Sequence, residues 1–295
     1  MTEPRDLHGP VLRWYAAHER PLPWRDPDVG AWAVFLSEVM SHQTPVARVE
    51  PIWREWLEKW PTPAALAADS PGEAVRRWGR LGYPRRALRL HESAVAMVEH
   101  HDGQVPADHE ALLALPGVGP YTAAAVMSFA FGAPVPVVDT NVRRVLARAV
   151  TGDAHAAVAL TRAESTLAAA AMPTDRDSAN RWNAAVMELG ALVCTARSPR
   201  CEECPIAHLC AWNMGGRPEY DGPPRRGQAW HGTDRQVRGR IVQALREADA
   251  PLAEATLLTV WPDDPAKARR CLGTLIEDGL VEPDETVPGH FHLPR

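Results

Sequence analysis

Lysine is the scarcest charged residue in this chain of 295 residues. Of its 32 basic residues only Lys59 and Lys267 are lysine, and the others are arginine. An arginine- and alanine-rich, lysine-poor chain is what a GC-rich genome encodes, so the bias is partly a codon effect. Any chemistry that needs a lysine amine therefore has only two candidate residues.

Long apolar runs are also absent. No run approaches the roughly 20 residues that a membrane helix needs. The first 24 residues are charged and lack the apolar core of a signal peptide. The hydrophobic fraction of 45% and the length fit two compact globular domains and a small third one. We therefore expect a cytoplasmic protein.

Positive charge is not in excess, because the formal net charge is −5. Taken alone, this value argues against a nucleic-acid partner. The arginines are unevenly placed, however: six lie between Arg76 and His91 with no acid among them, and a second group between residues 225 and 240 contains one acid, Asp234. Local positive faces on an acidic protein are compatible with DNA binding, and solvated helix faces explain the same pattern equally well.

Cysteine is rare, yet four of the five cysteines are clustered. Cys194, Cys201, Cys204 and Cys210 have the spacing C-x6-C-x2-C-x5-C, and Cys271 lies far away. Disulfides are not expected in a cytoplasmic chain, so the cluster points to a metal centre. Zinc and a [4Fe–4S] cluster both accept four thiolates. The two separated C-x2-C knuckles of zinc ribbons are missing, which favours [4Fe–4S]; zinc and chance clustering remain the alternatives.

Apolar residues recur at helical spacing through most of residues 1–214, with no convincing β-alternation. The sequence therefore predicts an all-α architecture for this part. The segments expected to be helical are 37–60, 84–100, 110–117, 121–132, 140–150 and 179–194.

A stretch rich in Gly, Pro and charge follows at 215–230 and reads as a linker. Residues 231–295 then contain two amphipathic segments, 233–249 and 265–283, and 289–294 is suited to a closing strand. Helices followed by a short hairpin predict a small α+β module of the winged-helix kind.

The stretch Leu115-Pro116-Gly117-Val118-Gly119 ends one helix and begins another. Its glycines permit tight turning and close backbone approach. The free N–H groups of the following helix form a natural phosphate seat. An isolated turn of this kind is more often a simple helix connection.

Here the hairpin is followed by Asp139 and by the four-cysteine motif. Together they resemble the helix-hairpin-helix DNA glycosylases that carry an iron–sulfur cluster, a superfamily that includes endonuclease III and the adenine DNA glycosylases. The resemblance covers residues 10–212. It implies a cluster domain (1–28 and 136–214), a six-helix barrel domain with the hairpin (29–135), and DNA bound across the cleft between the two. It also implies a [4Fe–4S] cluster on the four cysteines and a monovalent or divalent cation at the hairpin.

Tyr121 stands where endonuclease III-like members carry a lysine, whose amine forms a Schiff base and cleaves the strand. Tyrosine cannot form one, and neither Lys59 nor Lys267 lies in a matching motif. The resemblance thus implies a monofunctional enzyme, which removes a base and stops.

The stretch Ser37-Glu38-Val39-Met40 resembles the segment that carries the catalytic acid in adenine DNA glycosylases. Glu38 would protonate N7 of adenine, which requires a raised pKa in an enclosed pocket. Asp139 would remain ionised and stabilise the oxocarbenium-like sugar, with Asn141 as its polar partner. Taken alone, Glu38 is an ordinary exposed helix residue and Asp139 a helix N-cap.

Further positions match the family. Residues expected to enclose the flipped adenine are Arg20, Trp24 and Glu188. Residues expected to contact DNA are Gln43, Thr44, Tyr83, Gly117, Val118 and Gly119; of these, Gln43 and Tyr83 would wedge into the base stack. For Trp24 and the wedges, plain core packing is the alternative.

The chain departs from the family in three places. Ser41-His42 replaces a common Leu-Gln pair, and Pro84 stands where a second tyrosine is frequent. We expect no Nudix-like domain, which reads 8-oxoguanine in many members, because only 73 residues follow Gly222. We expect the C-terminal module to contact phosphates instead, through Arg225, Arg226, Arg235 and Arg238, and expect 41–44 and Tyr83 to recognise the partner base.

The sequence therefore predicts a monofunctional DNA glycosylase of base excision repair that removes adenine mispaired with 8-oxoguanine or guanine. We expect it to be a monomer, to act on double-stranded DNA and not on membranes, and to associate with a bacterial nucleoid. The alternatives are a mismatch thymine or uracil DNA glycosylase of the same fold and a non-catalytic iron–sulfur DNA sensor or regulator.

Overall fold

A computed structural model describes residues 2–220, 222 and 230–295 of the chain. Arg225 and Arg226, expected to contact phosphates, lie outside the described residues. The chain forms two compact units, each assembled from separate segments. The first unit comprises Met1–Val34, Ala107–Leu113 and Val118–Pro224, and the second comprises Phe35–Pro106, Ala114–Gly117 and Arg225–Arg295, as far as they are described.

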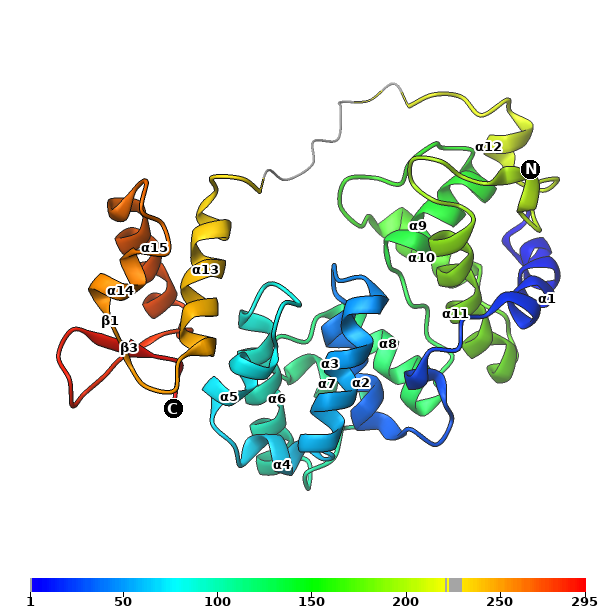
Figure 1. Cartoon of the computed structure of the whole chain (residues 1–295). Helices are drawn as coiled ribbons and strands as arrows, with labels where there is room; N and C mark the ends of the chain where they lie inside the picture. The colour runs from blue at the N-terminus through cyan, green and yellow to red at the C-terminus, as the bar shows by residue number, and fades with distance from the viewer. Residues whose placement is uncertain (1, 221, 223–229) are drawn as a thin grey trace. The chain divides into compact units, whose positions relative to one another are not determined.

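The first unit is helical. Its elements are η1 (Pro4–Leu7), α1 (His8–His18), η2 (Pro23–Arg25), α7 (His109–Ala114), α8 (Pro120–Phe131), α9 (Thr140–Leu146), the π-helical turn η3 (Ala147–Thr151), α10 (Arg162–Ala170), α11 (Arg176–Leu192), η4 (Cys201–Glu203) and α12 (Ala211–Met214). Helix α11 packs against α1 and α9, and Figure 1 shows these helices side by side. Buried side chains of α1 and α11, among them Val11, Tyr15, Trp182 and Leu189, share one core with the loop that carries the cysteines.

The second unit begins with the larger part of α2 (Gly30–Ser41) and continues with α3 (Val46–Lys59), α4 (Pro63–Ala67), α5 (Pro71–Arg77) and α6 (Arg85–His100). Three tryptophans fill its core. Trp56 lies edge-to-face on Trp60 and on Trp78, with ring centroids 4.7 and 5.6 Å apart, and all three side chains are fully buried. Such edge-to-face packing of large rings is a strong source of core stability.

The continuous helix predicted over 37–60 is wrong. Helix α2 ends at Ser41 and α3 begins at Val46. Gln43 has φ 53°, a left-handed conformation that ends the first helix. Pro45 is the N-cap of α3 and has no N–H with which to continue α2. The break places residues 42–45 in a loop.

The C-terminal module (231–295) belongs to the second unit. Its elements are α13 (Asp234–Glu247), β1 (Leu252–Ala253), α14 (Glu254–Leu258), α15 (Pro265–Glu277), β2 (Glu282–Pro283) and β3 (His290–His292). The strands pair antiparallel in the order β1-β3-β2. The apolar face of α13 is buried as predicted: Val237, Ile241, Val242 and Leu245 are at most 2% exposed. The short hairpin expected after the helices is formed by β2 and β3. Strand β1 was not expected, because two residues are too few to show alternation.

In the part of the chain that the structure describes, no helix has the length and apolar character needed to span a membrane.

Candidate active site and cluster pocket

Asp139 is the N-cap of α9 in the first unit. Its Oδ1 accepts hydrogen bonds from the backbone N–H groups of Asn141 (2.8 Å) and Val142 (2.7 Å), and its Oδ2 accepts one from Asn141 Nδ2 (2.7 Å). Burial raises the pKa of this carboxyl above its ordinary value, while these donors and Arg144 act in the opposite direction. The N-cap and the catalytic interpretations are therefore compatible, because the cap fixes a desolvated carboxylate in one orientation.

Arg144 links Asp139 to the cysteine loop. One guanidinium nitrogen donates to Asn141 Oδ1 (2.6 Å) and to the Gly190 carbonyl (2.7 Å), and Nε donates to the Cys194 carbonyl (2.6 Å). Gly190 is required at this contact, because a Cβ there would lie 2.6 Å from Asn141 Cβ. A continuous polar path thus runs from Asp139 through Asn141 and Arg144 to Cys194. Sequence reasoning missed Arg144, although its position three residues after Asn141 on a helix was a signal.

The four clustered cysteines line one pocket, together with Arg148, Trp212 and apolar side chains. Burial raises the pKa of the Cys204 thiol to about 12 and also raises that of Cys201 and Cys210. Thiolates are thus disfavoured unless a strongly cationic centre binds them, as iron does. Arg148 is 3% exposed and lies 3.4 Å from Cys194 Sγ through Nη1, which suits an anionic thiolate cluster. The donor set and the shared pocket fit an iron–sulfur cluster.

Among the described residues, no three His, Cys, Asp or Glu side chains are grouped as ligands of one metal ion. Cys271 is buried in α15 of the C-terminal module, in the second unit.

Glu188 and Arg20, both expected near the flipped adenine, bind each other. Arg20 donates from Nε and Nη2 to the two carboxylate oxygens at 2.7 and 2.8 Å, and Arg25 adds a third bond at 2.9 Å. Glu188 is 1% exposed, and these arginines lower its pKa to about 2 against the cost of burial. The side chain is thus an anion whose oxygens are both engaged. Trp24 is half-buried in η2 and directly precedes Arg25. Arg25 is the third member of the ion-paired group with Arg20 and Glu188, and sequence reasoning missed it.

Tyr121 lies in the first turn of α8, half-buried. Both lysines lie in the second unit and are held in ion pairs. Lys59 Nζ is 3.1 Å from Asp69 and 3.6 Å from Glu73, and Lys267 Nζ is 3.6 Å from Asp234. None of these lysine contacts involves a predicted site residue.

Two loops of the second unit carry the wedge residues in the same unusual conformation. Gln43 and Tyr83 are both exposed and have φ values of 53° and 48°. Non-glycine residues with positive φ are strained, and such strain persists where the surroundings impose it, often at functional sites. Thr44, expected to contact DNA, is 8% exposed, and its hydroxyl bonds to the carbonyls of His42 and Leu81. It joins the two loops and positions their exposed residues.

Arg86 holds both loops, and sequence reasoning missed it. Its guanidinium makes hydrogen bonds of 2.8–3.1 Å to carbonyls of the α2 end and of the loop after Trp78, and to the Thr44 hydroxyl. Burial lowers its pKa to about 10. The acid-free arginine run at 76–89 is thus partly an internal scaffold. The sequence alone could not predict these hydrogen bonds of Arg86, because their acceptors lie up to 47 residues away.

Glu38 lies in α2, half-buried, with buried neighbours at Ser37 and Val39. It belongs to the second unit and Asp139 to the first, so the predicted pairing of these carboxyls across one sugar stays a prediction. His42 follows α2; burial and Arg86 lower its pKa below the ordinary value of 6.5. We therefore expect neutral histidine at physiological pH.

The hairpin joins α7 to α8 as predicted. Gly117 has φ 78°, and a Cβ there would lie 2.7 Å from Arg89 Cβ, so only glycine fits. The Ser93 hydroxyl fixes the turn by donating to the Pro116 carbonyl at 2.7 Å. Val118 is 9% exposed, and Gly119 is the N-cap of α8 with open space around it. The open N-terminus of α8 is suited to the predicted phosphate contact.

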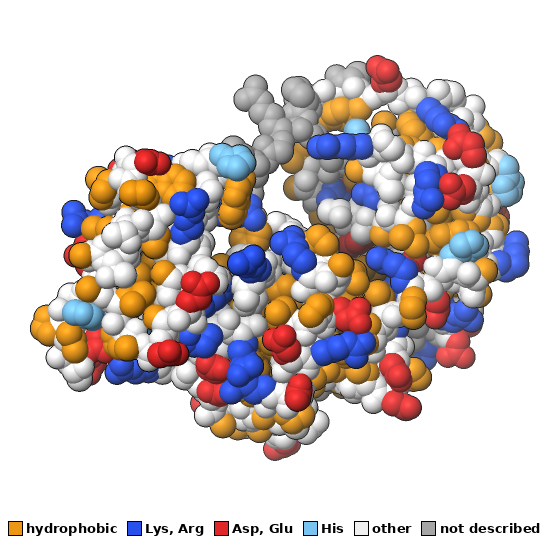
Figure 2. Space-filling view, in the orientation of Figure 1, with side chains coloured by type: hydrophobic (Ala, Val, Ile, Leu, Met, Phe, Trp, Pro, Cys, Tyr) orange, Lys and Arg blue, Asp and Glu red, His pale blue; other side chains and the backbone are white. Residues whose placement is uncertain are grey.

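Charged side chains of both signs share the face drawn in Figure 2. Arginines and lysines lie among aspartates and glutamates there and do not form one continuous basic surface.

Two family models match the chain. Residues 36–167 match the HhH-GPD superfamily base excision DNA repair protein, and residues 194–210 match the iron-sulfur binding domain of endonuclease III. The second match begins and ends at the first and last clustered cysteines, which confirms the predicted [4Fe–4S] cluster over zinc. The fold and site thus define a base excision DNA repair protein of the helix-hairpin-helix superfamily.

Individual relatives narrow this class. The adenine DNA glycosylase of Mycobacterium tuberculosis is 50% identical over 295 residues, 100% of this chain and 96% of the relative. That of Mycolicibacterium smegmatis is 53% identical over 283 residues, 96% of this chain and 94% of the relative. A solved thermostable thymine-DNA glycosylase is 27% identical with a TM-score of 0.65, over 72% of this chain and 97% of that one. The chain belongs to the adenine DNA glycosylase family.

Proposed function

We propose that this protein excises adenine mispaired with 8-oxoguanine or guanine from double-stranded DNA and leaves the strand intact. The observation that carries the proposal is the 50% identity to an adenine DNA glycosylase along the whole chain, C-terminal module included. The fixed, desolvated carboxylate of Asp139 also supports the proposal, because it is suited to stabilising a positive charge on the sugar.

In the proposed reaction Glu38 donates a proton to adenine N7. The bond from N9 to the sugar carbon C1′ then breaks, and its electron pair leaves with the base. A positive charge develops on the sugar, and Asp139 stabilises it as an anion, by charge or by a transient bond to C1′. Water, activated by the now ionised Glu38, adds to C1′ and gives an abasic site.

The environment of Asp139 suits this step. Burial raises the energy of its charged form, and the hydrogen bonds from Asn141 and Val142 hold that form in place. A buried anion gains more from a nearby developing cation than a solvated anion does, because little solvent screens the two charges. The interaction is therefore strongest in the transition state, as catalysis requires.

The product is an abasic site without strand cleavage. Tyr121 offers no amine for a Schiff base, and both lysines are engaged in ion pairs with carboxylates. The cluster on Cys194, Cys201, Cys204 and Cys210 would supply a rigid, charged centre for the surrounding loop. Arg20, Arg25 and Glu188 would form one wall near the base, with Trp24 beside them.

The remaining partners follow from the substrate. Gln43, Tyr83 and the open turn at Gly119 would contact the duplex. The hairpin would also hold a monovalent or divalent cation. The enzyme would work as a monomer at the bacterial nucleoid.

The test is single-turnover incubation with duplexes that carry A:8-oxoguanine, A:G, T:G or U:G. Abasic sites are scored by alkaline cleavage, and untreated samples report lyase activity. We expect adenine release from the first two duplexes only, without strand breaks before alkali. Release of thymine or uracil would instead support the mismatch pyrimidine glycosylase, and tight binding without any excision would support the sensor.

The first prediction concerns Glu38. Glu38→Gln keeps the shape of the side chain and loses the proton, so base release should fall by about 10²–10⁴-fold while duplex binding persists. Single-turnover rates and a binding titration measure both. A variant that excises adenine at the wild-type rate would remove Glu38 from the mechanism.

A further inference from the structure

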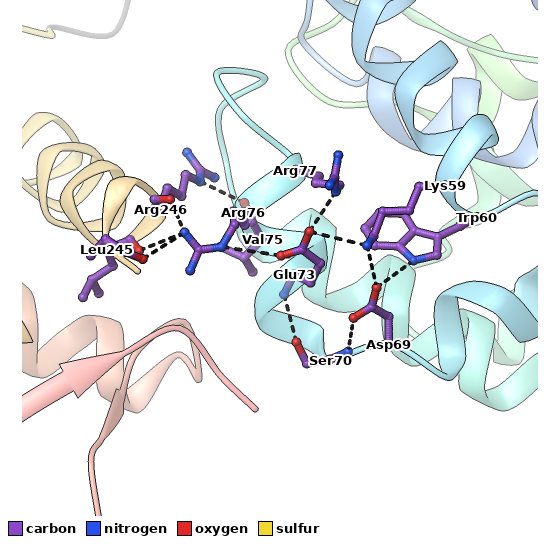
Figure 3. A network of polar contacts seen from close by, with 11 residues as sticks. Lys59, Trp60, Asp69, Ser70, Glu73, Val75, Arg76, Arg77, Leu245 and Arg246 are labelled. Atoms are coloured by element: carbon purple, nitrogen blue, oxygen red, sulfur yellow. Dashed lines mark hydrogen bonds and ion pairs between the residues drawn. The ribbon is translucent and has the colours of Figure 1, made fainter. Parts of the chain in front are cut away.

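The C-terminal module is joined to α5 by a reciprocal exchange of two arginines (Figure 3). Arg246 of α13 donates to the carbonyls of Val75 (2.8 Å) and Gly79 (2.6 Å), at the end of α5. Arg76 of α5 donates to the carbonyls of Arg246 and Ala248 at the end of α13. Each guanidinium thus satisfies carbonyls that the other helix leaves unpaired.

A second row of contacts runs beside α6. Arg85 and Arg238 both pair with Asp278, the C-cap of α15, and Arg238 also bonds to the Thr274 hydroxyl. The expectation that Arg238 contacts a phosphate is therefore not supported, because its guanidinium is already bound within the module. The module is held against the rest of the second unit by charged side chains that face inward.

Arg235 lies one turn before Arg238 on α13 and contacts Tyr83, the predicted wedge. Its guanidinium carbon is 4.3 Å from the centre of the Tyr83 ring and 5.3 Å from that of Trp230. Arg86 lies 6.0 Å from the Tyr83 ring and 5.0 Å from the Trp78 ring. Aromatic rings and guanidinium groups thus alternate in the order Trp230, Arg235, Tyr83, Arg86, Trp78.

Such an alternating stack holds a ring in place, because each cation is attracted to a ring face. Tyr83 needs this support: its backbone is left-handed at φ 48° and its side chain is 39% exposed. Arg86 fixes the backbone of its loop, through the carbonyls of Leu81 and Gly82. The C-terminal module contacts the Tyr83 ring through Arg235.

We propose that Arg235 is a positioning residue for Tyr83, through which the C-terminal module governs discrimination of the base opposite adenine without touching that base. The inference rests on the proposed function. It differs from phosphate binding by Arg235, because a guanidinium that binds phosphate would change affinity for all sequences equally and change its salt dependence.

The experiment is a double-mutant cycle with full-length protein. Single-turnover excision is measured on A:8-oxoguanine and A:G duplexes for wild type, Arg235→Met, Tyr83→Ala and the double variant. Methionine keeps the length of the side chain and removes the cation. The preference for 8-oxoguanine should fall about 2- to 30-fold in Arg235→Met, the range for one cation–π contact. The double variant should match Tyr83→Ala, because Arg235 acts through that ring.

Two controls separate the role from charge and from folding. Arg240→Met removes an arginine of the same helix that stacks on Trp261 at 4.8 Å, inside the module, and should leave the preference unchanged. Arg235→Lys keeps a cation above the ring and should recover most of the lost preference. Melting temperatures of all variants report whether the module stays folded.

Three results would overturn the inference: an unchanged preference in Arg235→Met, losses that add up in the double variant, or an equal loss in Arg240→Met with a reduced salt slope. Release of no adenine by the wild type on either duplex would instead overturn the proposed function itself.

Discussion

At the scale of single residues, Glu188 is the clearest stabilising side chain of the first unit. It is 1% exposed and bound by Arg20 and Arg25. Glu188→Gln leaves two partly exposed guanidinium groups without a counter-charge, so the free energy of unfolding should fall by about 1.5–3 kcal/mol. Urea denaturation measures this change. The matched control is Glu202→Gln, an exposed partner of Arg217 in the same unit, which should leave the stability unchanged.

The same carboxylate predicts a pH dependence. Its pKa is about 2 in the folded protein against an ordinary value of 4.5. A depressed acid pKa stabilises the fold above the unfolded value, and this stability is lost as pH falls from about 4.5 towards 2. Over that window the wild type should lose about 3 kcal/mol more than Glu188→Gln. Parallel acid profiles of the two proteins would contradict the assignment.

The pKa of Asp139 is shifted in the opposite direction from that of Glu188. Burial raises its pKa, so its anion is lost at a higher pH than that of an ordinary aspartate. The excision rate should therefore decline as pH falls through this raised value. Asp139→Asn retains a good N-cap for α9 but no charge, so we expect a folded protein with about 10²–10⁴-fold slower excision. A melting curve and single-turnover rates against pH test both parts; a variant with full activity would remove Asp139 from the reaction.

At the scale of elements, Arg86 is the residue that ties two loops together. Arg86→Met would leave the carbonyls of Val39, His42 and Leu81 without this donor. We expect a loss of at least about 2 kcal/mol of stability and faster amide exchange in residues 41–45 and 79–84. Arg89→Met, one turn later, breaks only an exposed ion pair with Glu92 and should resemble the wild type. Equal rates of amide exchange in these loops in Arg86→Met and Arg89→Met would contradict this role of Arg86.

These elements show what the sequence could predict. Helical periodicity located most helices, because each buries a continuous apolar stripe that is visible in its own residues. The loop at 42–45 was missed, because apolar residues continue at helical spacing on both sides of it. The cysteine spacing and Asp139 with Asn141 were found because each is local in the chain. The bonds of Arg86, Arg144 and Arg246 could not be predicted, because their acceptors are carbonyls of segments distant in sequence.

At the scale of the whole molecule, each unit is assembled from segments far apart in the chain, so distant residues meet in one network. In the first unit the path from Cys194 through Arg144 and Asn141 ends at Asp139. The cysteine loop therefore fixes one end of the hydrogen bonds that orient the catalytic candidate. Loss of the cluster should affect chemistry as well as stability.

The last prediction tests this link. Cys201→Ser removes one ligand of the cluster and changes neither Cys194 nor Arg144, which are joined by a hydrogen bond. Wild-type protein purified anaerobically should be yellow-brown with about four irons and four sulfides per chain. Cys201→Ser should lose most of the iron, melt at a lower temperature and excise adenine more slowly, because the loop no longer holds Arg144. Cys271→Ser, a buried cysteine of the second unit, should keep the iron and the excision rate. Full excision by an iron-free Cys201→Ser protein would show that Asp139 is oriented without the cluster, and the path through Arg144 would then be only structural.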